Sequence, residues 1–209
     1  MSDTEQTGGP ESQVLAGLAR LLGDDSAYSV TPAGEVLLCC SVSELHRVLK
    51  ALRDDDELAF TQLTDITAVD YPEREQRFEL VYQMLSVTRN ERIRLLVAVD
   101  EHDIVPSVTD LFMSANWAER EIWDMFGIFF SDHPDLRRLL TDYGFEGHPL
   151  RKDFPLTGYV EVRYSEAERR VVYEPTKLVQ EFRDFDFLSP WEGVQAQLAS
   201  DDASTDEGA

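Results

Sequence analysis

Two histidines lie among carboxylates in the second half of the chain, where they could bind a hydrolytic metal ion. The candidate ligands are His133, His148, Asp132, Asp135, Asp142 and Glu119. No H-E-x-x-H or H-x-H spacing fixes two ligands on one element, and both histidines precede prolines in turn-like sequence. We therefore expect both histidines to stabilise turns or to lie at an interface. A free-standing metal-dependent hydrolase is kept as an alternative.

The two cysteines, Cys39 and Cys40, are adjacent in an apolar run. An iron–sulfur cluster needs four ligands, usually thiolates, and a zinc ribbon needs paired C-x-x-C spacing. Neighbouring residues on a strand point to opposite faces, so these two cannot easily share one metal. We expect two small apolar residues on a buried strand, and no cluster held by this chain alone.

The sequence offers no catalytic nucleophile and no phosphate-binding loop. It contains no G-x-S-x-G, G-x-G-x-x-G or G-x-x-x-x-G-K-[ST] motif. Glu119, Glu121 and Asp124 could form a catalytic carboxylate pair, but Arg120 lies between them. A solvated or interfacial ion-pair face is the preferred interpretation. We expect no catalytic, cofactor-binding or metal-binding residue.

Hydrophobic periodicity predicts an α+β domain, with a mostly antiparallel sheet packed with helices. Helices are expected over 11–22 and 43–53. Ser43 should cap the second helix, which faces inward with Leu45, Val48, Leu49 and Leu52. Strands are expected over 35–42, 58–69, 77–88 and 91–100. The last two strands should form a hairpin that turns at Arg89-Asn90, and the last strand is apolar enough to be central.

A short aromatic helix is expected between Asn116 and Gly127. Asn116 is a suitable N-cap, Glu119 would complete a capping box, and Gly127 is a natural stop. Its large apolar side chains cover more than one narrow stripe, so the helix should be buried on more than one side.

Regular periodicity nearly disappears from Phe129 to Glu192, although the segment is rich in proline, glycine and aromatic residues. An extended chain this aromatic must bury its rings, which indicates a neighbouring subunit. Residues 132–170 hold seven basic and eight acidic side chains, and Arg137, Arg138 and Arg151 could pair with carboxylates across an interface. The predicted divisions are a disordered acidic N-terminus (1–10), the α+β domain (11–154), an extended partner-docking segment (155–192) and a disordered acidic tail (193–209).

The formal net charge of −22 argues against partners made of nucleic acid and against adsorption to anionic lipid. No apolar run is long enough to cross a bilayer, and no basic-then-apolar signal pattern begins the sequence. We expect a protein kept on the cytosolic side, which reaches a membrane only through a partner.

Three motifs together resemble one known family. They are the run from Asn116 to Gly127 (NWAEREIWDMFG), the run from His133 to Arg138 (HPDLRR) and the run from Thr141 to Pro155 (TDYGFEGHPLRKDFP). The match continues through GYVEVRY, YEP and FDFLSPWE to Glu192. This pattern is similar to the 30 kDa subunit family, the C subunits of proton-pumping NADH:quinone oxidoreductase, respiratory complex I. One departure is Met113, where the family commonly has proline.

The resemblance implies a cofactor-free subunit in the peripheral arm, on the cytoplasmic side of the bacterial inner membrane. It implies that the C-terminal stretch contacts the forty-nine-kilodalton (D) partner, which forms the quinone site with the twenty-kilodalton (B) partner. FMN, iron–sulfur clusters and quinone are bound by other subunits, and further peripheral-arm subunits lie nearby. A homologous subunit of a membrane-bound hydrogenase or of a quinone reductase with another electron donor is the nearest alternative.

The motifs also carry a set of residues that we expect at a partner interface. They are Trp117, Glu119, Arg120, Glu121, Asp124, Met125, Phe126, Gly127, His133, Pro134, Asp135, Arg137, Arg138, Asp142, Tyr143, Gly144, Phe145, Gly147, His148, Pro149, Arg151, Lys152, Asp153, Phe154, Pro155, Phe185, Pro190 and Trp191.

Overall fold

A β-hairpin forms the centre of the fold. The computed structural model describes residues 10–22 and 28–180, which fall into two units that divide after Gly158. In the first unit, β4 (Phe78–Ser86) and β5 (Glu91–Val99) pair antiparallel, and Asn90 in their turn has a φ of 55°. Every second residue of β5 from Ile93 to Val99 is buried, as in a strand packed on one face. The predicted hairpin is confirmed.

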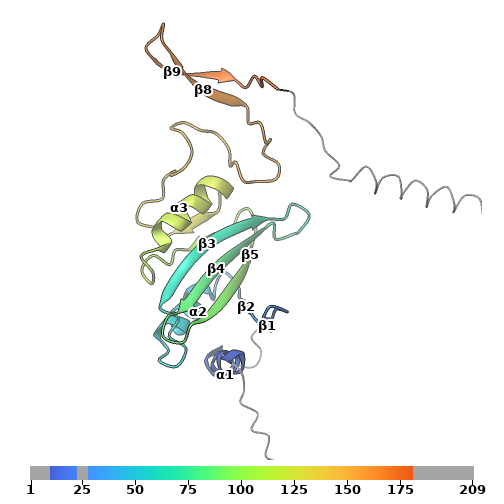
Figure 1. The fold of residues 1–209 in the computed structure, drawn as a ribbon, viewed down its shortest axis with the longest axis vertical. Helices are drawn as coiled ribbons and strands as arrows, with labels where there is room; N and C mark the ends of the chain where they lie inside the picture. Colours follow the sequence, from blue (N-terminus) through green and yellow to red (C-terminus); the bar gives the residue numbers. More distant parts are fainter. Residues whose placement is uncertain (1–9, 23–27, 181–209) are drawn as a thin grey trace, which may run out of the picture. The chain divides into compact units, whose positions relative to one another are not determined.

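This hairpin lies inside a five-stranded sheet of order β1-β2-β5-β4-β3 (Figure 1). The other strands are β1 (Tyr28–Val30), β2 (Val36–Cys39) and β3 (Gln62–Asp70). The β2–β5 pairing is parallel and the other pairings are antiparallel. The α+β class with a mostly antiparallel sheet is therefore confirmed, and β5 is a central strand as expected. At the other side of the sheet, β3 is an edge strand.

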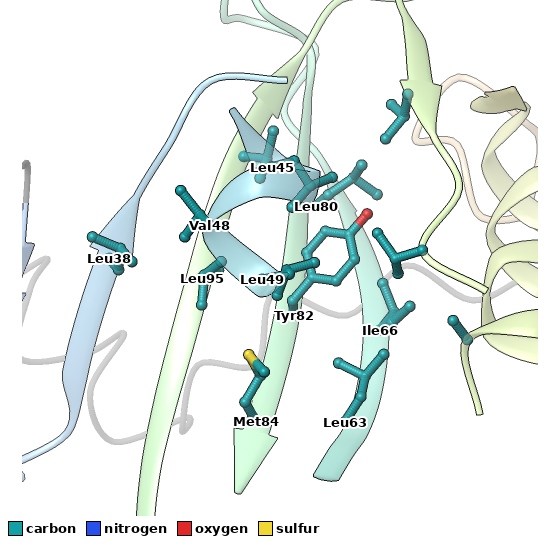
Figure 2. Close-up of a cluster of buried hydrophobic side chains, with 14 of the residues drawn as sticks. Leu38, Leu45, Val48, Leu49, Leu63, Ile66, Leu80, Tyr82, Met84 and Leu95 are labelled. Atoms are coloured by element: carbon teal, nitrogen blue, oxygen red, sulfur yellow. The ribbon is translucent and has the colours of Figure 1, made fainter. Parts of the chain in front are cut away.

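Helix α2 (Leu45–Asp54) covers one face of the sheet with the four leucine and valine side chains that its periodicity predicts (Figure 2). The predicted Ser43 cap is wrong. Glu44 occupies the cap position in a helical conformation without a side-chain cap, and the Ser43 hydroxyl bonds the Ser41 hydroxyl instead. Helix α1 (Pro10–Leu22) also matches its predicted range and buries Val14. Within the described residues, no helix has the length and apolarity needed to span a bilayer.

The expectation for the cysteines is half right. Cys39 ends β2 with its side chain exposed, whereas Cys40 is half-buried just after the strand. Burial raises the pKa of the Cys40 thiol to about 12, so this thiol stays protonated and weakly nucleophilic near neutral pH.

Helix α3 (Ala115–Phe126) lies alongside the edge strand β3 (Figure 1). It is flanked in sequence by β6 (Ile104–Pro106) and β7 (Phe129–Ser131), which pair in parallel. The helix ends where predicted, because Gly127 adopts the left-handed conformation with φ of 80°. After β7 the first unit continues without further helix or strand to Gly158.

The second unit contains a hairpin of β8 (Val160–Ser165) and β9 (Arg170–Pro175). No strand is expected in these residues from the sequence, so the hairpin is a correction, while their role as a docking segment stays a prediction. Their period-two alternation is a strand signal, but the four-residue turn lacks Gly, Asn-Gly or Pro, and Arg169 takes the left-handed position with φ of 52°.

Candidate functional site

One buried carboxylate of α3, that of Asp124, binds four consecutive residues of the segment between β7 and Gly158. We call residues 132–155 the signature loop, because they carry most of the motifs found in the sequence. Asp124 Oδ2 accepts the backbone N–H groups of Leu139, Leu140 and Thr141 at 2.9, 2.8 and 3.1 Å. Asp124 Oδ1 accepts the Thr141 hydroxyl at 2.7 Å and Arg138 Nη1 at 2.9 Å.

These donors decide the ionisation of Asp124. Burial by itself would raise the pKa of this carboxyl group, but the hydrogen bonds from Thr141, Leu140 and Leu139 outweigh burial and hold the pKa well below its ordinary value. The side chain is inaccessible to solvent. The prediction of a solvated or interfacial ion-pair face is thus wrong for Asp124 and for Glu119, both of which point inward, and it fits only the exposed Glu121.

Glu119 is a second buried carboxyl group on α3, and it binds the segment that follows β6. Its Oε1 accepts the Val108 N–H at 2.8 Å and its Oε2 accepts the Ser107 hydroxyl at 2.7 Å. Burial raises the pKa of Glu119 to about 7, although these two hydrogen bonds oppose the shift. The predicted capping box is therefore wrong. The helix begins one residue before Asn116, and Glu119 turns toward the core rather than back to the helix start.

Both histidines of the loop bond the backbone rather than converging on a common point. His133 Nε2 donates to the Asn116 carbonyl at 3.0 Å, and His133 Nδ1 accepts the Asp135 N–H at 3.1 Å. A carbonyl only accepts and an amide N–H only donates, so neither ring nitrogen has a lone pair left for another partner. His148 Nδ1 donates to the Asp124 carbonyl at 3.0 Å, and burial lowers the pKa of His148.

No three His, Cys, Asp or Glu side chains in the described part of the chain are grouped as metal ligands would be. The hydrogen bonds of the two histidines fit the turn-stabilising role expected from the sequence.

The second half of the signature loop is tied to the sheet. The Lys152 N–H donates to Asp70 Oδ2 at 2.7 Å, and Arg77 bridges Asp70 and Asp153 with bonds of 2.7 and 2.9 Å. The rings of Phe145 and Phe154 pack with centroids 5.9 Å apart. Hydrogen bonds of the signature loop thus reach α3, Asp70 at the end of β3, and Arg77 just before β4.

Two of the three arginines expected to reach across an interface are occupied within the chain. Arg138 binds Asp124 and the Gly147 carbonyl, and Arg151 binds the Phe126 carbonyl and the Glu101 carboxylate. Only Arg137 remains largely exposed, and its guanidinium pairs with neighbouring Asp135.

The motif residues therefore divide by exposure. The buried or half-buried ones are Glu119, Arg120, Asp124, Met125, Phe126, Gly127, His133, Arg138, Phe145, His148, Pro149, Arg151, Phe154 and Pro155. The exposed ones are Trp117, Glu121, Pro134, Asp135, Arg137, Asp142, Tyr143, Gly144, Gly147, Lys152 and Asp153, although Asp153 also pairs with Arg77. Phe185, Pro190 and Trp191 lie outside the described residues. A role at a partner interface stays a prediction for the exposed group.

Sequence reasoning missed four residues that bind the motif side chains or the loop backbone: Ser107, Thr141, Asp70 and Arg77. Asp70 could have been found from the sequence, because it is an acidic residue at an inward-facing position of a strand. The other three have no distinctive spacing from their partners.

The hairpin of the second unit separates apolar from polar residues by face. Directly paired residues of antiparallel strands lie on the same face. The pairs Val160–Pro175, Val162–Tyr173 and Tyr164–Val171 form an apolar face, whereas the pairs Glu161–Glu174, Arg163–Val172 and Ser165–Arg170 form the opposite, mainly polar face. Val160, Val162, Tyr164 and Val171 are 44–59% exposed. On the polar face, Arg163 pairs with Glu174.

Comparison with known proteins connects this architecture to one family. Residues 38–160 match the family model described as respiratory-chain NADH dehydrogenase, 30 Kd subunit. The C subunits of NADH-quinone oxidoreductase from Brucella abortus (strain 2308) and Brucella ovis are each 59% identical over 181 residues, covering 87% of this chain and 90% of the relative.

Two solved structures are also similar. A trypsin-resistant fragment (1–134) of Nqo5 is 30% identical with a TM-score of 0.51, and the match covers 60% of this chain and 99% of the fragment. A chain of the membrane-bound sulfane sulfur reductase, an archaeal respiratory membrane complex, has a TM-score of 0.59 over 70% of this chain and 85% of that chain. At 24% identity, the second likeness shows the fold alone.

Proposed function

Because the chain belongs to the 30 Kd subunit family of respiratory-chain NADH dehydrogenase, we propose that it is a non-catalytic structural subunit of NADH:quinone oxidoreductase. Its role is to hold neighbouring subunits in place during electron transfer from NADH to quinone. In this proposal the chain binds no cofactor, and FMN, iron–sulfur clusters and quinone are bound by other subunits.

The observation that carries this proposal is the apolar face of the β8–β9 hairpin. An isolated two-stranded hairpin is marginally stable in water, and a face of valine and tyrosine side chains without a charged residue is typical of a surface that another protein covers. Four of its side chains are about half exposed within the described chain. The buried ion pairs of the signature loop, by contrast, serve the fold of the first unit.

We assign the covering partner to the forty-nine-kilodalton (D) subunit, with the twenty-kilodalton (B) subunit close by, and we call these two the quinone-site subunits. The chain would then reach the cytoplasmic side of the inner membrane through the complex. The trypsin-resistant Nqo5 fragment supports a division of labour: it matches 60% of this chain, so a compact first unit would fold by itself and the rest would serve assembly.

A pair of substitutions on adjacent valines tests this role. Val171 lies on the apolar face of β9 and Val172 on the polar face, opposite Arg163, so aspartate at the two positions makes the same chemical change on opposite faces of one strand. Val171→Asp should sharply reduce recovery of the quinone-site subunits when the tagged chain is purified from membranes, because it places a charge in the contact. Val172→Asp should leave recovery close to that of the wild type. Equal recovery with both variants, or no recovery of either partner with the wild type, would contradict the proposal.

A further inference from the structure

A groove lies between the edge strand β3 and helix α3, and all the residues that line it belong to the first unit. It has a volume of about 550 Å³. One wall is Leu63–Ile66 of β3, and the other is formed by Ser114, Trp117 and Glu121 of the α3 region with Leu140 of the signature loop. None of the signature-loop hydrogen bonds described above requires this groove, so its shape has no evident role within the chain.

The β3 wall has the character of a site for an extended segment. In the described chain, β3 pairs only with β4, so its outer side is a sheet edge. The register shifts between Leu63 and Asp65, which marks a bulge, and Ser114 Oγ donates to the Leu63 carbonyl at 3.0 Å. Bulges and covering helices are two ways in which proteins protect sheet edges. A groove between an edge strand and a helix is also a recurrent place for binding an extended peptide.

The apolar part of the groove is exposed and lies next to groups that are bonded within the chain. Trp117 is 66% exposed and Leu140 is 61% exposed. The Arg120 guanidinium lies 5.9 Å from the centre of the Trp117 ring and donates to the Arg137 and Arg138 carbonyls, and the Leu140 N–H is bonded to buried Asp124. The backbone that carries Leu140 and one neighbour of the Trp117 ring are therefore held before any partner binds, which lowers the entropy cost of binding. Tryptophans are common binding hot spots.

Charge selects the kind of partner. Asp65 and Glu121 are exposed residues that line the groove, and no lining residue is basic. We propose that the groove binds an extended segment of a neighbouring subunit in which an apolar residue stands next to Lys or Arg. The apolar side chain packs between Trp117 and Leu140, and the cation meets the two carboxylates. This inference rests on the proposed function, because the partner is another subunit of the same complex.

The chain's own ends fit this groove poorly. Residues 1–11 and 193–209 contain seven acidic and no basic side chains, so the groove carboxylates would repel them. A second copy of this chain would also bring a surplus of negative charge, because the net charge is −22.

Photo-crosslinking in the assembled complex tests the proposal. We would place a benzoylphenylalanine at Trp117 in one full-length variant and at Leu140 in another, each in cells that have no other copy of the chain. The expected result is a crosslink from both positions to a neighbouring subunit, at a peptide in which Lys or Arg flanks an apolar residue. The same probe at Val87, which is 61% exposed in the β4–β5 turn, should not crosslink to that peptide.

Charge reversal supplies an independent measurement. Glu121→Arg should raise the apparent dissociation constant of the chain from the rest of the complex roughly tenfold at moderate salt. Glu73→Arg makes the same change at an exposed position outside the groove and should retain wild-type binding. Crosslinks within the chain, to a second copy or to an acidic segment would overturn the proposal, and so would equal effects of the two reversals.

The outcomes also separate this inference from the proposed function. If the quinone-site subunits co-purify with the wild type but neither groove probe crosslinks to a neighbouring subunit, the groove assignment is wrong while the structural role stands. If no other part of the complex co-purifies with the wild type, the proposed function itself fails.

Discussion

Helix α3 carries two carboxyl groups that are both shielded from water, and their surroundings have opposite effects on ionisation. Asp124 receives five hydrogen bonds from four residues of one loop, and these favour the charged form. Glu119 receives two, too few to balance the cost of burying a charge, so burial raises its pKa to about 7. The number of donors, rather than burial alone, separates the two groups.

The raised pKa of Glu119 makes stability depend on pH. Below its ordinary value of 4.5 the carboxyl group is protonated in the folded and the unfolded chain, and this contribution to stability is fully present. As pH rises toward 7 the unfolded chain releases the proton first, so the contribution is lost. Relative to Glu119→Gln, the wild type should lose about 3 kcal/mol of unfolding free energy between pH 4.5 and pH 8.

Urea unfolding of both proteins across this pH range measures the difference. Glu121→Gln removes a charge from the exposed side of the same helix and reports the general effect of charge removal. The stability difference between the wild type and Glu119→Gln could vary with pH as little as that between the wild type and Glu121→Gln. In that case the folded chain does not raise the pKa of Glu119, and the group is ionised near neutral pH.

Asp124→Asn tests the opposite case. The variant removes the buried charge while its donors remain, so we expect a loss of about 3–5 kcal/mol of unfolding free energy at pH 7. Because the folded-state pKa is depressed, the stabilisation is present above the ordinary value of 3.8 and disappears as pH falls below it. The exposed Asp142 provides the control: Asp142→Asn should change stability by less than about 0.5 kcal/mol. Similar unfolding midpoints for the two variants would show that Asp124 does not anchor the loop.

At the scale of elements, the sequence predicts most helices and strands of the first unit from their periodicity, but not the partners of the residues at helix ends. The β4–β5 hairpin and the inward face of α2 follow from side-chain alternation within one segment. Both predicted N-terminal helix caps are wrong, because the Ser43 hydroxyl and the Glu119 carboxylate find partners that the local sequence does not reveal. The β8–β9 hairpin is harder to predict, because its turn lacks the usual turn residues.

The contrast between local sequence pattern and distant contacts also explains how much of the candidate site can be predicted. The motifs identify the residues of the signature loop, but only the structure separates inward side chains such as Arg138 from outward ones such as Trp117. The groove depends on a helix lying against an edge strand about fifty residues away in sequence, and no local pattern predicts that packing.

The junction between α3 and the signature loop can be tested with two glycines. Gly127 has a φ of 80°, and a Cβ there would lie 2.6 Å from His148 Nε2 and 2.7 Å from Arg151 Nη2. Gly144 has a φ of 78° but nothing within 4 Å of the corresponding position. Gly144→Ala should therefore cost only the backbone strain, about 1 kcal/mol, and Gly127→Ala about 1–3 kcal/mol more. Thermal unfolding measures both, and equal losses would show that the two side chains move aside freely.

At the scale of the whole molecule, the buried core and the proposed docking hairpin belong to different units. In the described chain, every residue of the hydrophobic core lies between Val14 and Phe130. The loop that follows remains bonded to that core as far as Asp153. The hairpin, by contrast, keeps its valines and tyrosines about half exposed. Stability and assembly should therefore depend on separate parts of the chain.

Truncation after Gly158 tests this separation. The shortened chain keeps the entire core and the signature loop, so its unfolding free energy should lie within about 0.5 kcal/mol of the full-length value. It should nevertheless fail to recover the quinone-site subunits from membranes, because the apolar face of the hairpin is gone. Denaturant unfolding and affinity purification measure the two properties independently. Loss of a cooperative transition would mean that the first unit needs the rest of the chain to fold. Full recovery of the partners would instead assign the essential contact to the first unit, where the groove beside Trp117 is the remaining candidate.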